Sequence, residues 1–150
     1  MRIVLQRVSE ANVKVNNEVV GEINKGILVL LGIEEADNED DMQWLINKII
    51  NLRIFDDENG VMNLSVHEIQ GQILLVSQFT LHASTKKGNR PSYIKAAKPD
   101  FAQQQYHRFY QLLLTQFTGR VACGVFGADM KVGLINDGPV TIIIDSKNKE

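Results

Sequence analysis

The Gly138-Pro139 step, in the run NDGPVTIIID, restricts the backbone more than any other dipeptide in the chain. Proline has no N–H and holds φ near about −65°, so Pro139 can only open the strand that follows or lie on a sheet edge. X-Pro is also the bond type for which the cis form is accessible. The polar turn at Asn136 and Asp137 and the apolar run after it indicate a rigid wall of bare backbone, whose carbonyls could face a pocket. An ordinary strand-starting turn has the same pattern, and both interpretations stay open at this point.

Apolar periodicity predicts the remaining elements. Met42, Leu45 and Ile49 follow helical spacing after an acid-rich start at Asp37, which predicts an amphipathic helix to about Leu52. A second helix is predicted from Pro99 to Gly119, a turn at 56–60 and a long polar loop at 82–98. Strands are predicted over 2–8, 11–16, 18–23, 27–33, 72–81, 120–126, 130–135 and 140–145, with a hairpin turn at Asn16-Asn17.

The order of these elements predicts the fold class. Strand-rich ends enclose two helices, and strands and helices do not alternate regularly. This order favours an α+β fold with a mostly antiparallel, barrel-like sheet and two main amphipathic helices. A length of 150 residues fits one domain over 1–150 with its own core.

Composition excludes several classes of protein. The net charge of −2 argues against coating nucleic acid by bulk charge, and no apolar run approaches a membrane span. The start, MRIVLQRV, lacks signal-peptide architecture, and the single cysteine, Cys123, can form no internal disulfide, so a cytoplasmic location is expected. The three histidines are scattered and no phosphate-binding glycine loop is present, so no cofactor and no metal are expected.

One loop carries a concentrated positive charge. No acidic residue lies between Glu68 and Asp100, whereas this stretch contains Lys86, Lys87, Arg90, Lys95 and Lys98. Such a loop on a mildly acidic body suits contact with a few phosphates, although charged runs are usually solvated surface.

Chemistry-bearing residues gather in SQFTL, residues 77–81, where an apolar strand gives way to polar side chains. Ser77 and Thr80 are candidate nucleophiles, but each needs a nearby base, and the neighbouring His82 has no visible acid partner. The backbone N–H groups around Phe79 and Thr80 are better candidates, because amides can stabilise an oxyanion without any special side chain.

SQFTL and NDGPVT together resemble the two signature motifs of the D-aminoacyl-tRNA deacylases. The opening RIVLQRV, GILVLLGI, LRIFDDENGVMNLSV, the KKGNRPSY loop and FGADM also resemble that family, so the similarity extends over nearly the whole chain.

The resemblance implies hydrolysis of the ester that joins a D-amino acid, or mischarged glycine, to the terminal adenosine of tRNA. It also implies a homodimer with sites at the subunit interface and a cis Gly138-Pro139 that excludes L-amino acids from the partner's site. By the same resemblance, Ser77, Gln78, Phe79 and Thr80 line the catalytic pocket. Arg7 holds the Gly-Pro segment and Met130 flanks the pocket.

Several alternatives remain at this point. Thr80 could be a covalent nucleophile, or the ribose 2′-hydroxyl of the substrate could help to activate water, which we favour because no base for Thr80 is evident. Lys86, Lys87 and Arg90 are expected to contact the acceptor stem. A non-catalytic RNA- or nucleotide-binding dimer and a small-ester hydrolase are the competing functions.

Overall fold

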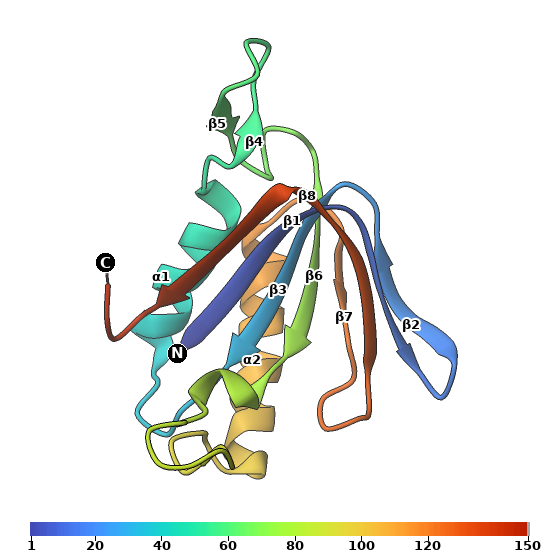
Figure 1. Ribbon diagram of the computed structural model, residues 1–150. Coiled ribbons are helices and arrows are strands. Elements are labelled where there is room, and N and C mark those ends of the chain that lie inside the picture. Colours follow the sequence, from blue (N-terminus) through green and yellow to red (C-terminus); the bar gives the residue numbers. More distant parts are fainter. Residues whose placement is uncertain (150) are drawn as a thin grey trace.

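The computed structural model describes residues 1–149 and shows a strongly curled sheet with two helices against one face (Figure 1). Within these residues the main sheet has six strands, in the order β2-β1-β3-β6-β7, and β8 pairs with β1. The strands are β1 Arg2–Val15, β2 Glu18–Ile23, β3 Gly26–Gly32, β4 Phe55–Asp56, β5 Met62–Leu64, β6 Gln72–Ser77, β7 Val121–Cys123 and β8 Lys131–Asp145. The helices are α1 Glu39–Asn51, the 3₁₀ helix η1 Phe79–His82, and α2 Pro99–Gln116.

The predicted hairpin at Asn16-Asn17 is confirmed. Both residues have positive φ, 50° and 65°, as a two-residue turn of this kind requires, and they join β1 to β2. The predicted break between strands 2–8 and 11–16 is wrong, because β1 is one continuous strand. Its pairing with β8 shifts register on both sides of Val8.

Both predicted helices are confirmed. Asn38 and Asp41 form a capping box at the start of α1, which satisfies two backbone N–H groups. Pro99 occupies the first turn of α2, where its missing N–H has no cost, and Phe117 caps the other end. No helix in the described part of the chain is both long and apolar enough to cross a membrane.

The helices cover the face of the sheet that carries Ile3, Val29 and Leu75, and the side chains between them form the larger core. Helical periodicity directs Leu45, Ile49 and others into this layer. Burial of each large aliphatic side chain contributes about 1.5–3 kcal/mol. The helical side chains that are buried in this core are Met42, Leu45, Ile46, Ile49, Ile50, Tyr106, Phe109 and Leu113.

The sheet is mixed. The expected antiparallel pairing is confirmed for β1 with β2, β3 and β8, but β3 with β6 and β6 with β7 are parallel. Each parallel pair is joined by a crossover that contains a helix, α1 or α2, which returns the chain to the same end of the sheet.

The sheet curls until β2 approaches β7, and this gives the barrel-like shape. A Cβ on Gly21 would lie 2.6 Å from the carbonyl oxygen of Cys123, so only glycine permits the close approach. A second, smaller core fills the curl, and its buried members are Val8, Ala11, Val13, Ile23, Leu28, Leu74 and Val76.

The predicted strand boundaries need three corrections. The strand predicted over 72–81 ends at Ser77, and the strand predicted over 120–126 is limited to Val121–Cys123. The strands predicted over 130–135 and 140–145 form one strand, β8, which continues across Gly138-Pro139 because β1 pairs with it on both sides.

Gly26 yields a stability prediction. A Cβ at this position would lie 1.9 Å from the carbonyl oxygen of Gln72, so Gly26→Ala must separate the starts of β3 and β6. We expect a loss of about 1–3 kcal/mol in the free energy of unfolding, measured by denaturant titration. Gly133→Ala is the matched control, because its nearest neighbour is a movable Asn12 side chain at 3.3 Å. Equal stability of the two variants would contradict the prediction.

Candidate active site

The end of β6 places the SQFTL residues at one end of the sheet. Gln78 follows the last strand residue, and its backbone N–H donates to the carbonyl of Leu31 at 2.7 Å. The chain then turns into η1, which packs on Gly32, where a Cβ would lie 3.0–3.1 Å from His82, Leu81 and Gln78. The lack of a side chain at Gly32 therefore lets η1 lie directly against β3.

The start of η1 leaves backbone donors free. The first backbone hydrogen bond of this helix is donated by Leu81 to the carbonyl of Gln78, at 3.2 Å. The N–H groups of Phe79 and Thr80 precede it and have no acceptor inside the helix. Two adjacent amides without intrahelical partners suit the stabilisation of a negatively charged oxygen.

A pocket of about 480 Å³ lies beside Phe79, the first residue of η1, and we call it the η1 pocket. Among the predicted site residues, Ser77, Gln78 and Phe79 line it, whereas Thr80 and Met130 are not among its lining residues. Its remaining walls come from β3, the end of the long loop, α2 and the segment after β7, through Leu31, Ile33, Tyr93, Ala96, Ala97, Lys98, Pro99, Ala102, Phe126 and Gly127.

The mouth of the η1 pocket is aromatic. The Phe79 side chain is 56% exposed, and its ring meets that of Tyr93 edge-on, with centroids 5.0 Å apart. Lys98 is the one charged residue that lines the pocket in the described part of the chain. The pocket therefore provides apolar surface and backbone polar groups, and its lining has no carboxylate or imidazole for acid–base catalysis.

The Thr80 hydroxyl accepts a hydrogen bond from the Gln78 side-chain amide, and no base among the described residues contacts it. His82 is buried, at 4% exposure, and its Nε2 atom has no hydrogen-bond partner in residues 1–149. Met130 is half-buried and packs its sulfur over Gly124.

Gly138-Pro139 is a cis peptide in β8, which is an edge strand because it pairs with β1 alone. The pairing of β1 with β8 passes from Val8↔Asn136 directly to Gln6↔Thr141, so residues 137–140 bulge out of the ladder. The interpretation of Pro139 as a strand-opening residue is wrong, and the edge-strand interpretation is confirmed.

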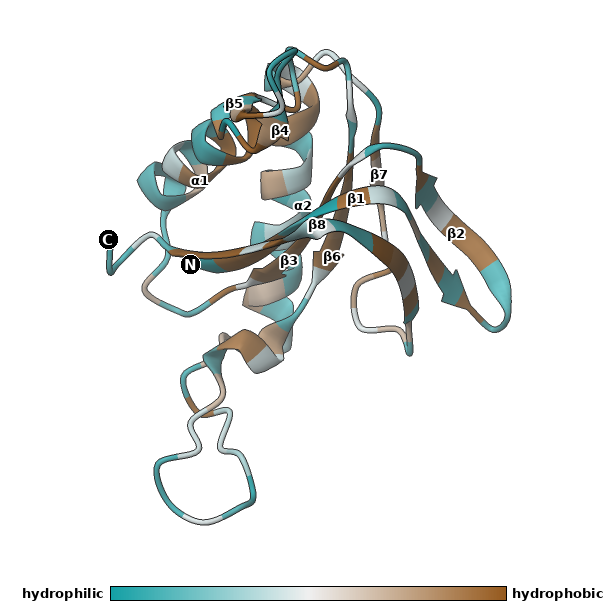
Figure 2. Cartoon of the chain, turned by 45° about the horizontal axis from the view of Figure 1, so that its top comes forward, coloured by the Kyte–Doolittle hydropathy of each residue, from teal (hydrophilic) through white to brown (hydrophobic). Residues whose placement is uncertain are grey.

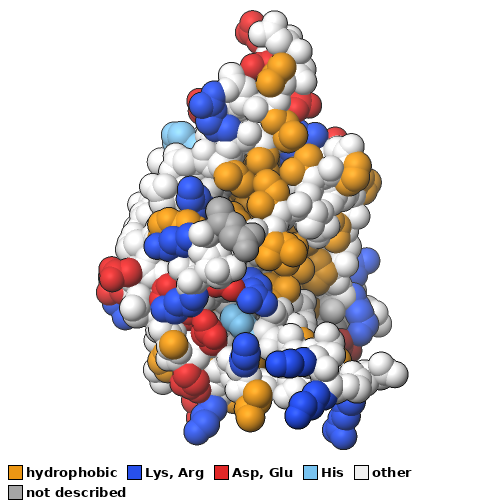
Figure 3. All heavy atoms as spheres, turned by 60° about the vertical axis from the view of Figure 1, so that its left-hand side comes forward, with side chains coloured by type: hydrophobic (Ala, Val, Ile, Leu, Met, Phe, Trp, Pro, Cys, Tyr) orange, Lys and Arg blue, Asp and Glu red, His pale blue; other side chains and the backbone are white. Residues whose placement is uncertain are grey.

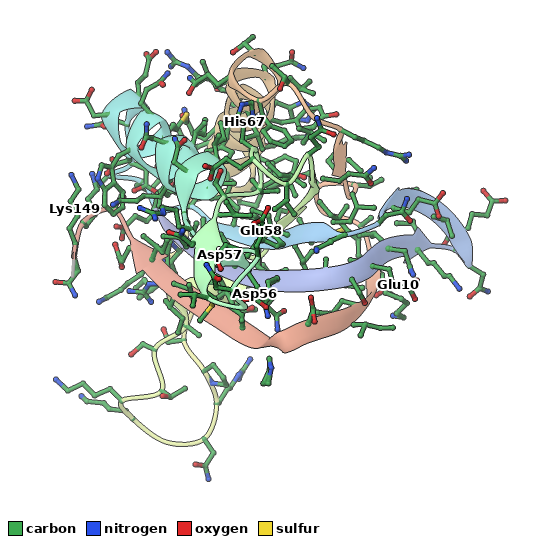
Figure 4. All side chains as sticks on the ribbon, turned by 90° about the horizontal axis from the view of Figure 1, so that it is seen from above. Glu10, Asp56, Asp57, Glu58, His67 and Lys149 are labelled. Atoms are coloured by element: carbon green, nitrogen blue, oxygen red, sulfur yellow. The ribbon has the colours of Figure 1, made fainter. Side chains whose placement is uncertain are left out.

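Arg7 lies beneath this bulge and ties it to the rest of the domain. Its Nε donates to the carbonyl of Asp137 at 2.8 Å, and its Nη1 donates to the carbonyl of Ile54 at 2.7 Å and to Asp56 Oδ1 at 3.2 Å. Figure 4 shows Asp56 over β1 and β8, where β8 bends. The Arg7 side chain is only 8% exposed, whereas its partner Asp56 is 50% exposed, so the bond to the Ile54 carbonyl is the one most shielded from water.

Asn136 closes the other side of the bulge. Its Oδ1 accepts the backbone N–H of Val140 at 2.8 Å, and its Nδ2 donates to the Thr141 hydroxyl at 2.9 Å. The bulge is therefore held at both ends, while Gly138 and Pro139 between them are exposed.

The bulge lies beside the middle of β1, whereas η1 lies at the N-terminal end of that strand. Arg2 contacts the carbonyl of Leu81 in η1, whereas Arg7 contacts Asp137. Five residues of a strand span roughly 17 Å, so the bulge of one chain lies well away from the η1 pocket of the same chain.

The long loop predicted over 82–98 is confirmed over 83–98, because His82 belongs to η1, and Figure 2 shows the loop extending from the body as a polar hairpin. Ser84 and Ser92 exchange two backbone hydrogen bonds, at 2.8 and 2.9 Å, which close its neck. Lys86, Lys87 and Arg90 are exposed in its outer part. Figure 3 shows basic side chains crowded at this end of the molecule.

Several residues of the site were not identified from the sequence. Tyr93, Phe126 and Gly127 line the η1 pocket, and Asp56 and Asn136 hold the bulge. The pairing of Phe79 with Tyr93 joins parts of the chain that a polar loop separates. The available signal was that Tyr93 ends the KKGNRPSY segment and that Phe126 and Gly127 open FGADM.

Comparison with known proteins gives one consistent family. Residues 4–145 match the family model described as D-Tyr-tRNA(Tyr) deacylase. The chain is 61% identical to the D-aminoacyl-tRNA deacylase of Flavobacterium johnsoniae over 150 residues, which cover all of both proteins.

Two solved structures are similar in fold. A c-Myc DNA unwinding element binding protein is 41% identical, with a TM-score of 0.92, over 97% of this chain and 98% of that one. A probable eukaryotic D-amino acid tRNA deacylase has a TM-score of 0.75 over 95% of this chain and 97% of that one. At 17% identity, it shows the fold alone.

Proposed function

The chain belongs to the D-aminoacyl-tRNA deacylases, a family of hydrolases, and we propose that it cleaves D-aminoacyl-tRNA at the η1 pocket. The products are the free D-amino acid and tRNA, and glycine on non-cognate tRNA is a further substrate. The observation that carries the proposal is that η1 begins with two backbone amides, of Phe79 and Thr80, without intrahelical partners, and that Phe79 lines an apolar pocket of about 480 Å³. The proposed location is the cytoplasm, where charged tRNA is present.

The chemistry requires little from side chains. Water attacks the ester carbonyl carbon, the carbonyl oxygen becomes an oxyanion, and the N–H groups at the start of η1 stabilise it. The bond between that carbon and the ribose oxygen then breaks, and the ribose oxygen takes up a proton. We infer that the neighbouring ribose 2′-hydroxyl helps to activate the water, since the pocket lining has no carboxylate or imidazole.

Thr80→Ala tests this mechanism. Because the Thr80 hydroxyl accepts from Gln78 and contacts no base, we expect the single-turnover rate on D-tyrosyl-tRNA to fall less than about tenfold. A fall to nearly zero with tRNA binding intact would instead identify Thr80 as the nucleophile.

We assign the exclusion of L-amino acids to the backbone of Gly138 and Pro139. A main-chain wall where an L side chain would lie rejects L-substrates by steric clash and admits glycine, which has no side chain to exclude. Arg7 and Asn136 support this assignment, because their hydrogen bonds hold the bulge from both sides.

The active unit is proposed to be a homodimer. The roughly 17 Å along β1 between the bulge and η1 supports this arrangement, because one chain's wall is out of reach of its own pocket. A second copy of the chain can provide the wall. Apolar side chains on β8 support the same conclusion, since Ile143 is 69% exposed beside a groove of about 580 Å³ (Figure 3).

The acceptor stem is proposed to lie against the basic loop. Replacing Lys86, Lys87 and Arg90 with glutamine should weaken tRNA binding and lower the slope of log K against log salt by about one for each lost phosphate contact. The control replaces three exposed cations, Lys14, Lys25 and Arg120. Lys25 and Arg120 lie beside the starts of β3 and β6, whereas the basic loop comes after the end of β6. Filter binding at several salt concentrations measures both triple variants, and an unchanged slope in the loop variant would rule the contact out.

Charged D- and L-tyrosyl-tRNA test the function directly. The protein is expected to release D-tyrosine and leave L-tyrosyl-tRNA intact. A small-ester hydrolase would ignore the tRNA and cleave free amino acid esters, and a non-catalytic binder would protect the ester from spontaneous hydrolysis.

The binding alternative has one further motivation, the description of a close structural relative as a DNA unwinding element binding protein. Duplex DNA added as a competitor in the same assay separates the two functions. Inhibition of deacylation by acceptor-stem RNA but not by duplex DNA is the result expected of a deacylase.

A further inference from the structure

We propose that Arg2, held by Asp145, is a positioning residue that sets the orientation of η1 and so aims the Phe79 and Thr80 amides at the substrate. The proposal rests on the proposed function of the η1 pocket. It assigns a role in the reaction to two residues at the ends of β1 and β8, outside both SQFTL and NDGPVT.

The contact is made at the C-terminal end of η1. Arg2 Nη1 donates to the carbonyl oxygen of Leu81 at 2.8 Å. Leu81 is two residues from Phe79 in a helix of only four residues, so a rotation of its peptide plane turns the whole helix. A carbonyl at a helix C-terminus carries partial negative charge, which makes it a good acceptor for a guanidinium group.

Packing on Gly32 and the bond from the Gln78 N–H to the Leu31 carbonyl hold η1 on the side of β3. Its N-cap, Gln78, makes no side-chain capping bond, and 3₁₀ helices have poorer hydrogen-bond geometry than α-helices. Gly32 has no side chain, so the backbone of β3 contacts η1 directly. On another side lies the groove of about 580 Å³, whose lining includes both Leu81 and Arg2. Arg2 is therefore the polar contact from β1 that fixes the helix on this side.

Asp145 holds the guanidinium group in place. Its Oδ2 accepts from Arg2 Nε at 3.0 Å and from Nη2 at 2.8 Å, and its Oδ1 accepts the backbone N–H of Lys147 at 2.9 Å. Burial raises the pKa of Asp145, but the bonds from Arg2 and Lys147 outweigh this and hold its pKa below the usual value. The carboxylate is thus charged at neutral pH.

The geometry requires an arginine. A guanidinium group directs Nε and Nη2 to one acceptor and Nη1 to another in a fixed plane, whereas a lysine ammonium group has no such fork. The distance between Asp145 and the Leu81 carbonyl is thereby set by the size of one rigid group.

Arg2→Ala, Arg2→Lys and Asp145→Asn test the proposal in full-length protein. The measurements are the saturating single-turnover rate on D-tyrosyl-tRNA, the enzyme concentration for half-saturation, and the unfolding temperature. Because a displacement of 1 Å can cost about 100-fold in rate, we expect the rate of Arg2→Ala to fall roughly 10- to 100-fold, with half-saturation changed less than about threefold. Arg2→Lys should not restore the rate.

Arg108→Ala is the control, because it removes an arginine from an exposed ion pair with Glu39 on the helices and should retain the wild-type rate. The double variant, with Arg2→Ala and Asp145→Asn, should have the same single-turnover rate as Arg2→Ala alone, since both changes act through the same contact. Asp145→Asn keeps the shape of the side chain and provides the test if Arg2→Ala does not fold.

A wild-type rate in Arg2→Ala or Arg2→Lys would overturn the proposal, as would a rate loss that Arg108→Ala shares. Wild-type protein that leaves D-tyrosyl-tRNA intact would instead overturn the proposed function.

Discussion

Alanine at position 138 is expected to lower the D-tyrosyl-tRNA deacylation rate by roughly 10- to 100-fold and to reduce discrimination against the L-substrate. Gly138 has φ of +139°, a region that L-residues rarely adopt and that costs about 1–3 kcal/mol. An added Cβ would also lie 2.7 Å from Val140 Cγ2 and 3.0 Å from Arg7 Nη2. The bulge must therefore shift, and the wall that we propose it offers to a partner's pocket shifts with it.

Single-turnover rates on D- and L-tyrosyl-tRNA measure both effects. Gly60→Ala is the matched control, because Gly60 also has positive φ, +72°, but its Cβ would meet nothing within 4 Å. A Gly138→Ala protein with full rate and full D/L discrimination would return this segment to an ordinary bulge without a role in selection.

Replacing Arg7 with methionine is expected to destabilise the domain by about 2–4 kcal/mol, because charge-assisted bonds to the buried side of the bulge are lost together. Methionine keeps much of the side-chain volume, so the change reports on the hydrogen bonds more than on packing. The Asp56 and Asp137 side chains are about half exposed and can be hydrated, so the main loss is at the Ile54 and Asp137 carbonyls.

Denaturant unfolding measures the loss of stability, and discrimination between D- and L-tyrosyl-tRNA, assayed where the variant is fully folded, measures the effect on the bulge. Arg53→Met is the control, because Arg53 also donates to a carbonyl, that of Asn63 at 2.8 Å, but is exposed. Its effect on stability should stay below about 1 kcal/mol. If Arg7→Met behaves like this control, Arg7 does not hold the bulge.

Local chemistry made much of the fold predictable. Asn16-Asn17 could be recognised because its two residues adopt the positive φ of a tight hairpin turn, and α1 because Met42, Leu45 and Ile49 repeat at helical spacing. Strand ends were less predictable. Phe79 and Leu81 are apolar enough to continue β6, but Gly32 opens space for η1 to turn against β3 instead.

The residues of the candidate site also divide into those that the sequence indicated and those whose role depends on the fold. Ser77, Gln78, Phe79, Gly138 and Pro139 were identified because each lies in a short motif. Tyr93 and Asn136 also lie in quoted segments, KKGNRPSY and NDGPVT, but the role of each could not be predicted because it depends on a contact that only the fold shows.

By itself, the sequence determined the two segments that are proposed to form the site, SQFTL and NDGPVT, and the positions of α1 and α2. The tertiary structure alone decided that Gly138-Pro139 bulges from a continuous edge strand. It also decided that Arg2, at the start of β1, contacts η1, and that Arg7, near the middle of β1, contacts the bulge. The physical reason is the distance along the chain between the residues that interact. Turns and helices depend on neighbours in the chain, whereas bonds from Arg2 to Leu81 or from Arg7 to Asp137 exist only after the sheet has set the register.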